Sequence, residues 1–218
     1  MNKKTLIFDL DGTLIDSLED IALCMNEVLK SLNLKTHKIE DYKYFVGGGV
    51  DILVQNCLDE NIDKELKQKV TSEFKRVYDQ ELHNNTKPYE GIYELLDELD
   101  GKYNLAILSN KPHEFTIAYA NKFFSKYNFL EVHGQKKDVP KKPDATAASN
   151  IAKNIGVKNE DCFFIGDTLV DMQTAKNANM IGIGVLWGFR DEKELLDNGA
   201  LHLVTYPSEI VEILNNYN

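Results

Sequence analysis

The stretch TLIFDLDGTLIDS, residues 5–17, combines a strand signal with a pair of acids. The apolar run 6–8 is typical of a buried strand, and it ends abruptly at Asp9. Asp11 follows two positions later, so both carboxylates project to about the same side, and Gly12 begins a turn. Because neighbouring carboxylates repel, a proton, a lysine or a divalent cation must compensate them. The stretch therefore predicts a charged site at the end of a buried strand.

The composition restricts the classes of partner and location. The chain has 218 residues, 43% of them hydrophobic, which is enough for one large core or a core with a small second unit. A net charge of -10 argues against nucleic acid or an anionic membrane as the main partner. No signal peptide or membrane span is expected, because the first apolar stretch breaks at Asp9 and no segment approaches about 20 apolar residues. The cysteines, Cys24, Cys57 and Cys162, form no metal or disulfide pattern, so a reducing cytoplasm is expected. Nothing in the sequence indicates an oligomeric state.

Strand and helix patterns alternate from residue 86 to the end of the chain. Strands are predicted at 104–109, 129–134, 162–167, 181–188 and 202–206, and helices at 91–99, 113–127, 145–155, 170–177, 192–197 and 208–214. Together with the strand at 5–8, this alternation predicts an α/β fold with a doubly wound parallel sheet. Ligands of such sheets bind at the carboxyl ends of the strands.

Residues 16–85 read as an all-helical insert between residues 1–15 and 86–218, which would form the core. Apolar residues recur at helical spacing from Leu18 to about residue 32 and again over 62–82. Ser17 and Asp20 resemble a variant capping box at the start of the first helix. Hinges between the two units are expected at 14–18 and 84–88.

Three consecutive glycines form a conspicuous segment within the insert. Gly47, Gly48 and Gly49 allow a backbone to approach a ligand closely, and free N–H groups can cradle an anion. A loose turn before the helical segment VDILVQNCL is the alternative interpretation.

A second pair of acids follows another predicted strand. Asp167 stands at the end of CFFIGDT, and Asp171 enters the following helix. If these acids and the pair at Asp9 and Asp11 converge on one crevice, they suggest a hard cation with oxygen ligands, of which Mg²⁺ is the usual one. Such a cation also attracts phosphate.

Four segments resemble the motifs of a known family. DLDGTLIDS, LSN, KKP and GDTLVDM are similar to the four motifs of the haloacid dehalogenase superfamily and stand in the same order. The resemblance implies a Rossmann-like core with a small helical cap between the first and second motifs. The segments FVGGGV, residues 45–50, and VLWGFR, residues 185–190, resemble those of phosphoglycolate phosphatase-like members.

The resemblance also implies roles for the acids. Asp9 matches the nucleophile, which would form an aspartyl phosphate. Asp11 matches the general acid and base, and its backbone carbonyl is expected to contact the metal. The implied metal ligands are Asp9, Asp11 and Asp167. Asp171 would bind a water on the metal or orient the lysine of the third motif.

The second and third motifs would hold the phosphoryl group. Ser109 and Asn110 match the position where a hydroxyl and the following backbone N–H groups hold phosphoryl oxygens, although Ser109 could instead cap a helix. Lys142, directly before Pro143, matches the lysine that faces the attacking carboxylate and the phosphoryl group. Its neighbour Lys141 stays an alternative.

These observations predict a Mg²⁺-dependent phosphatase that hydrolyses a small phosphorylated metabolite and is similar to phosphoglycolate phosphatases. A phosphoglucomutase-like transferase uses the same acids, and an inorganic pyrophosphatase is a further alternative. A phosphoacceptor signalling domain is disfavoured, because its acid pair and phosphorylated aspartate lie on different strands. A silent binding protein is disfavoured by the complete set of four motifs.

Overall fold

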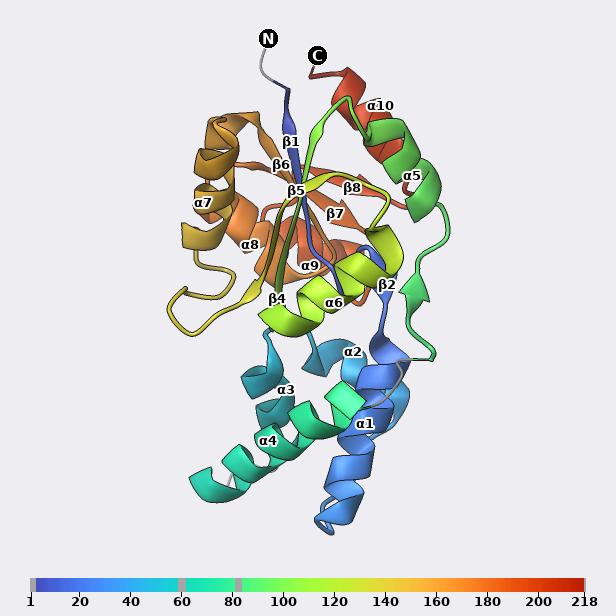
Figure 1. Cartoon of the computed structure of the whole chain (residues 1–218), viewed down its shortest axis with the longest axis vertical. Helices are drawn as coiled ribbons and strands as arrows, with labels where there is room; N and C mark the ends of the chain where they lie inside the picture. The colour runs from blue at the N-terminus through green and yellow to red at the C-terminus, as the bar shows by residue number, and fades with distance from the viewer. Residues whose placement is uncertain (1–2, 59–61, 81–83, 218) are drawn as a thin grey trace.

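A six-stranded parallel sheet forms the centre of the computed structural model, which describes residues 3–58, 62–80 and 84–217 (Figure 1). The strand order is β5-β4-β1-β6-β7-β8. The strands span β1 Thr5–Phe8, β4 Asn104–Pro112, β5 Phe129–Gln135, β6 Cys162–Gly166, β7 Ile181–Val185 and β8 His202–Val204. The order reverses beside β1, which pairs with β4 on one side and β6 on the other. The predicted doubly wound α/β fold is confirmed.

Helices cover both faces of this sheet. One face packs against α5 (Ile92–Leu99), α6 (His113–Phe124) and α10 (Glu209–Asn215), and the other against α7 (Thr146–Ile155) and α8 (Leu169–Asn177). The short helix α9 (Glu192–Asp197) follows β7. Because side chains alternate along a strand, Leu6 and Phe8 enter one hydrophobic cluster and Ile7 enters the other. All three are buried, as expected for a central parallel strand.

A helical insert, residues 17–86, lies beyond the carboxyl ends of the strands (Figure 1). It contains α1 (Leu18–Ser31), the 3-10 turn η1 (Ile39–Asp41), α2 (Tyr42–Phe45), α3 (Val50–Cys57) and α4 (Lys64–Gln80). Its two connections to the core pair as a short antiparallel ribbon, formed by β2 (Ile15–Asp16) and β3 (Lys87–Pro88). The helix predicted over 62–82 begins at Lys64, and its residues 81 and 82 lie outside the described part.

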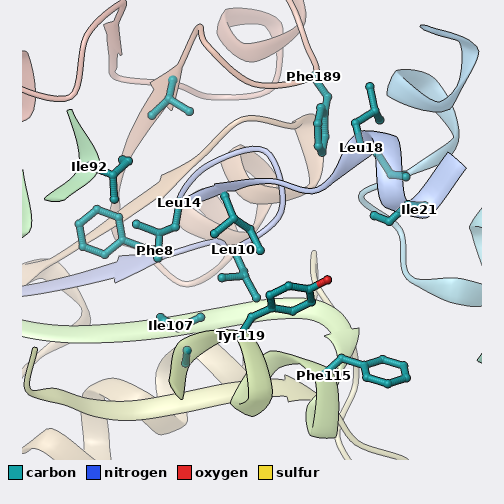
Figure 2. Close-up of a cluster of buried hydrophobic side chains, with 14 of the residues drawn as sticks. Phe8, Leu10, Leu14, Leu18, Ile21, Ile92, Ile107, Phe115, Tyr119 and Phe189 are labelled. Atoms are coloured by element: carbon teal, nitrogen blue, oxygen red, sulfur yellow. The ribbon is translucent and has the colours of Figure 1, made fainter. Parts of the chain in front are cut away.

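The hydrophobic core continues from the sheet into the insert. Phe8 and Leu14 pack near Ile92 of α5, while Leu18 and Ile21 extend the same cluster into α1 (Figure 2). Because this cluster continues across the ribbon, complete separation of the two units would expose apolar surface. Among the described residues, no helix combines the length and the apolar character that crossing a bilayer requires.

Several predicted boundaries were wrong in ways that matter for the site. The strand predicted to end at Ser109 continues to Pro112, because the chain pairs with β5 again at Pro112, opposite Gln135, after a register shift that follows Leu108. The predicted capping box is also wrong. Ser17 makes no side-chain cap, because its hydroxyl donates to Asp11 at 2.5 Å, and Asp20 accepts hydrogen bonds from the segment before β3.

The chain turns back after β7, so this strand is shorter than predicted and ends at Val185. The following loop reaches the first motif and the insert. Trp187 Nε1 donates to Thr13 O at 2.9 Å, and the Arg190 guanidinium donates to Val46 O at 3.1 Å. The loop therefore connects the core with both segments that border the candidate site.

Candidate active site

The carboxyl ends of β4, β1 and β6 bring the first, second and fourth motifs together. Asp9 follows β1 directly, and its backbone N–H donates to Ile165 O of β6 at 2.9 Å. Asp167 follows β6, and Ser109 lies near the end of β4. Neighbouring parallel strands end at the same edge, so residues far apart in the sequence meet there.

Lys142 lies between two carboxylates at this edge. Its Nζ is 2.9 Å from Asp9 Oδ1 and 2.7 Å from Asp171 Oδ1. Asp171 is fixed in turn, because Thr168 donates to its Oδ2 through both the hydroxyl, at 2.7 Å, and the backbone N–H, at 3.0 Å. Lys142 Nζ therefore bridges the carboxylates of Asp9 and Asp171. The neighbouring Lys141 points elsewhere, so the structure places only Lys142 of the two at Asp9.

Asp167 is buried next to this pair and held by two donors. Thr13 Oγ1 donates to its Oδ1 at 3.0 Å, and the Phe189 N–H donates to its Oδ2 at 2.9 Å. Gly12 lies against the same carboxylate with a φ of +86, and a Cβ at that position would be 2.2 Å from Asp167 Oδ2. Only glycine tolerates both the left-handed backbone and this close approach.

The electrostatics of the acids fit a bound cation. Asp9, Asp167 and Asp171 each offer an oxygen within 4.8 Å of the others. Burial, reinforced by the charge of Asp171, raises the pKa of Asp9 to about 7, although Lys142 opposes this shift. Burial and the two neighbouring acids raise the pKa of Asp167 well above its ordinary range. Burial lowers the pKa of Lys142, but the charges of Asp171 and Asp9 more than compensate and raise it.

One buried oxygen provides a direct test of this fit. Within the ranges that the structure describes, Asp9 Oδ1 has the ion pair with Lys142 Nζ, at 2.9 Å, and no hydrogen-bond partner besides it. A buried oxygen without a hydrogen bond is costly unless another ligand satisfies it. A hard cation with carboxylate ligands would do so, and the residues present therefore fit Mg²⁺.

The Asp11 carboxylate lies apart from this cluster, at the boundary with the insert. Lys111 Nζ is 3.1 Å from its Oδ1 and 3.2 Å from its Oδ2, and Ser17 donates to Oδ1. Lys111 was not predicted as a site residue, although it follows Ser109 and Asn110 directly. A single lysine after a strand has no distinguishing pattern, and its partner becomes evident only when β4 and β1 are paired.

Asn110 and Lys141 contact the glycine segment of the insert. Asn110 Nδ2 donates to Gly47 O at 3.1 Å, and Lys141 Nζ donates to Gly48 O at 2.9 Å. The Asn110 side chain also pairs with the Lys142 backbone, donating to its carbonyl and accepting from its N–H. This side chain therefore positions the second and third motifs relative to each other and to the insert.

A pocket opens between the core and the insert beside these residues. Acids, a lysine and polar groups from the core line one side, and mainly apolar residues from the insert line the other. The lining residues are Asp9, Asp11, Ser109, Asn110, Lys111, Pro112 and Phe115 from the core, and Ile21, Val46, Gly47, Gly49, Val50, Leu53, Phe74 and Tyr78 from the insert.

Comparison with known proteins identifies the family of this arrangement. Residues 6–185 match the model of the haloacid dehalogenase-like hydrolases. A phosphoglycolate phosphatase of Aquifex aeolicus is 30% identical over 98% of both chains, and one of Colwellia psychrerythraea is 32% identical over 90% of both. The crystal structure of a predicted phosphoglycolate phosphatase from Haemophilus somnus superposes with a TM-score of 0.90 at 25% identity, covering 98% of this chain and 99% of the other. These matches confirm the resemblance drawn from the four motifs and the predicted enzyme class. The chain therefore belongs to the haloacid dehalogenase-like hydrolase family.

Proposed function

We propose that this chain is a Mg²⁺-dependent phosphatase that hydrolyses a small phosphomonoester through an aspartyl phosphate on Asp9. The observation that carries the proposal is the environment of Asp9. This carboxylate is buried at a strand end, 2.9 Å from Lys142, and lies within 4.8 Å of two further carboxylates beside a pocket. Structural acids seldom gather in this way without a cation or a catalytic role.

The reaction would proceed in two steps. A carboxylate oxygen of Asp9 forms a bond to phosphorus while the bond to the leaving oxygen breaks. Asp11 gives its proton to that oxygen, which leaves as an alcohol. In the second step Asp11 takes a proton from water, and the water oxygen attacks the phosphorus of the aspartyl phosphate. Inorganic phosphate is released and Asp9 is restored.

The remaining groups would bind and orient the phosphoryl group. Ser109 and the backbone N–H groups after it would hold its oxygens, and Lys142 would neutralise part of its charge. Asp9, Asp167 and the backbone carbonyl of Asp11 would hold Mg²⁺. When bound, this ion would offset the charge that the phosphate brings to the carboxylates.

The substrate would be small, with phosphoglycolate as the first candidate. This proposal rests on the phosphoglycolate phosphatases among the relatives and on the pocket, one side of which is lined by residues of the insert. We propose that the insert acts as a cap, which excludes water while the aspartyl phosphate exists. Asn110 and Lys141 would stabilise its closed position through the carbonyls of Gly47 and Gly48.

A screen of phosphate release, with and without Mg²⁺, tests the function. The substrates are phosphoglycolate, sugar phosphates, nucleotides and inorganic pyrophosphate. We expect Mg²⁺-dependent release from a phosphomonoester and none from the Asp9→Asn protein. Isomerisation of a sugar phosphate would identify a mutase, and preference for pyrophosphate would identify a pyrophosphatase. Full activity of the Asp9→Asn variant would reject the proposed nucleophile.

A further inference from the structure

Lys111 is the one lysine that lines the pocket, among the residues described. Its side chain is only 5% exposed, and its Nζ lies 3.1 Å and 3.2 Å from the two oxygens of Asp11. A buried lysine held against one carboxylate is costly unless its geometry is well satisfied. The reaction described above assigns Lys111 no role.

The third polar contact of Lys111 comes from the insert. Its Nζ donates to the Tyr78 hydroxyl at 2.8 Å, and Tyr78 belongs to α4. The same Nζ lies 4.7 Å from the centre of the Tyr78 ring and 4.9 Å from that of Tyr119 on α6. One ammonium group therefore joins Asp11 of the first motif to a helix of the insert.

These contacts continue toward the connections between insert and core. The hydroxyls of Tyr78 and Tyr119 lie 2.9 Å apart, and Tyr119 lies 3.5 Å from Thr86 Oγ1. Thr86, directly before β3, donates to Asp20 of α1. The Tyr119 hydroxyl is oriented toward the side where α1 begins (Figure 2). Movement of the insert would therefore alter the environment of Lys111.

We infer that Lys111 is a positioning residue that orients the Asp11 carboxylate toward the leaving group. Because Lys111 also contacts Tyr78, this orientation depends on the position of the insert. The inference rests on the proposed function. Where the structure describes the chain, Asp11 Oδ1 accepts from both Ser17 and Lys111, whereas Oδ2 accepts from Lys111 alone, at 3.2 Å. Oδ2 is thus the oxygen with more freedom to face the leaving oxygen, which takes up a proton as its bond to phosphorus breaks. Lys111 makes and breaks no covalent bond.

Comparing two esters with different leaving groups distinguishes positioning of Asp11 by Lys111 from a structural or phosphate-binding role of Lys111. Ethyl phosphate needs a proton on its leaving oxygen, whereas para-nitrophenyl phosphate hardly does. The comparison uses kcat/KM, which reports formation of the phosphoenzyme and not its later hydrolysis. We expect Lys111→Met to lower kcat/KM for ethyl phosphate about 100-fold or more. The loss for para-nitrophenyl phosphate should be less than about tenfold on the same principle.

Two further variants refine the test. Tyr78→Phe removes one hydroxyl and keeps the ring, so it should show the same selectivity with a loss of roughly 2- to 10-fold. If Lys111→Met does not fold, as judged by thermal unfolding, the selectivity of Tyr78→Phe tests the positioning role in its place. Combining Lys111→Met with Asp11→Asn should cost no more for ethyl phosphate than Asp11→Asn alone, because both act through one proton transfer.

The chain offers matched controls. Lys126 also pairs with a carboxylate, Asp97 at 2.8 Å, and lies 4.7 Å from the ring of Tyr127. Lys126→Met and Tyr127→Phe remove the same groups outside the pocket and should leave kcat/KM unchanged for both esters.

Several outcomes would overturn the inference. Equal losses for both esters would show a structural or phosphate-binding role for Lys111, as would additive losses with Asp11→Asn. A loss confined to phosphoglycolate, with ethyl phosphate unaffected, would show that Lys111 binds the carboxylate of the substrate instead. If the wild-type protein with Mg²⁺ turns over no ester at all, the proposed function fails, and the inference fails with it.

Discussion

Replacing Asp9 by asparagine should stabilise the metal-free protein at high pH while abolishing turnover. Asp9 is buried, its Oδ1 has no partner but Lys142 in the described part of the chain, and two other carboxylates lie within 4.8 Å. Its ionised form is therefore disfavoured in the folded state, despite the ion pair with Lys142. Asparagine has nearly the shape of the protonated acid and carries no charge, so it should relieve this penalty.

The sign and size of the effect follow from proton linkage. The pKa of Asp9 is raised from 3.8 to about 7, so the folded state binds more protons than the unfolded state between these values. The corresponding stability is fully present below the unfolded pKa and is lost as the pH rises through the folded pKa. Three pKa units correspond to about 4 kcal/mol, which is the upper limit of the stabilisation in Asp9→Asn above neutral pH. The difference should vanish near the unfolded pKa.

Denaturant unfolding in the presence of a chelator, at about pH 5 and about pH 8, measures this difference. Asp79→Asn, which changes an exposed acid on α4, is the control and should show no such trend. Added Mg²⁺ should stabilise the wild-type protein and have a smaller effect on Asp9→Asn. If the Asp9→Asn protein instead becomes relatively less stable as the pH rises, the ionised Asp9 carboxylate stabilises the metal-free fold and the expected penalty does not exist.

Three further variants test other parts of the account. Gly12→Ala should reduce Mg²⁺ protection against thermal unfolding, because the new methyl group would meet Asp167 and the backbone strain alone costs about 1–2 kcal/mol. Asp20→Asn should lower the free energy of unfolding at neutral pH by about 1–3 kcal/mol through weaker hydrogen bonds to Thr86. Burial raises the pKa of Asp20, but its hydrogen bonds to Thr86 and Asn85 lower it overall. The stability that Asp20 contributes should therefore be lost as the pH falls through its folded pKa, which unfolding measured over a range of acid pH would show. Lys141→Ala should raise KM more than it lowers kcat in steady-state kinetics, since Lys141 contacts the insert and not Asp9. A fall in kcat with little change in KM would show that Lys141 takes part in the chemical step.

The sequence predicted the parts of the site that depend on the strand pattern. Asp9 and Asp167 each end an apolar run, and neighbouring parallel strands place such ends at one edge. Their proximity therefore follows from the fold class. Gly12 was expected to begin a turn, whereas its close approach to Asp167 is seen only in the structure.

Contacts between side chains from separate units could not be predicted in this way. Tyr78 lies on the buried face of α4 and was not predicted as a site residue, yet its hydroxyl accepts a hydrogen bond from Lys111. Neither residue differs in pattern from any other tyrosine or lysine. Lys141 and Lys142 are neighbours in the sequence, but their side chains run in different directions. Lys141 contacts Gly48, and Lys142 contacts Asp9. Such contacts depend on the packing of the insert against the core, which periodicity does not describe.

Trapping the phosphoenzyme shows whether Asp9 is the nucleophile. Asp11→Asn protein is mixed with Mg²⁺ and para-nitrophenyl phosphate, quenched in acid and mapped by peptide mass spectrometry. The good leaving group allows the first step without a general acid, and the missing base slows the second. We expect a protein heavier by one phosphoryl group, carried on the peptide that contains Asp9 and absent when Asp9 is also replaced. Continued release of nitrophenol from an unmodified protein, or a phosphoryl group on another residue, would exclude an aspartyl phosphate on Asp9.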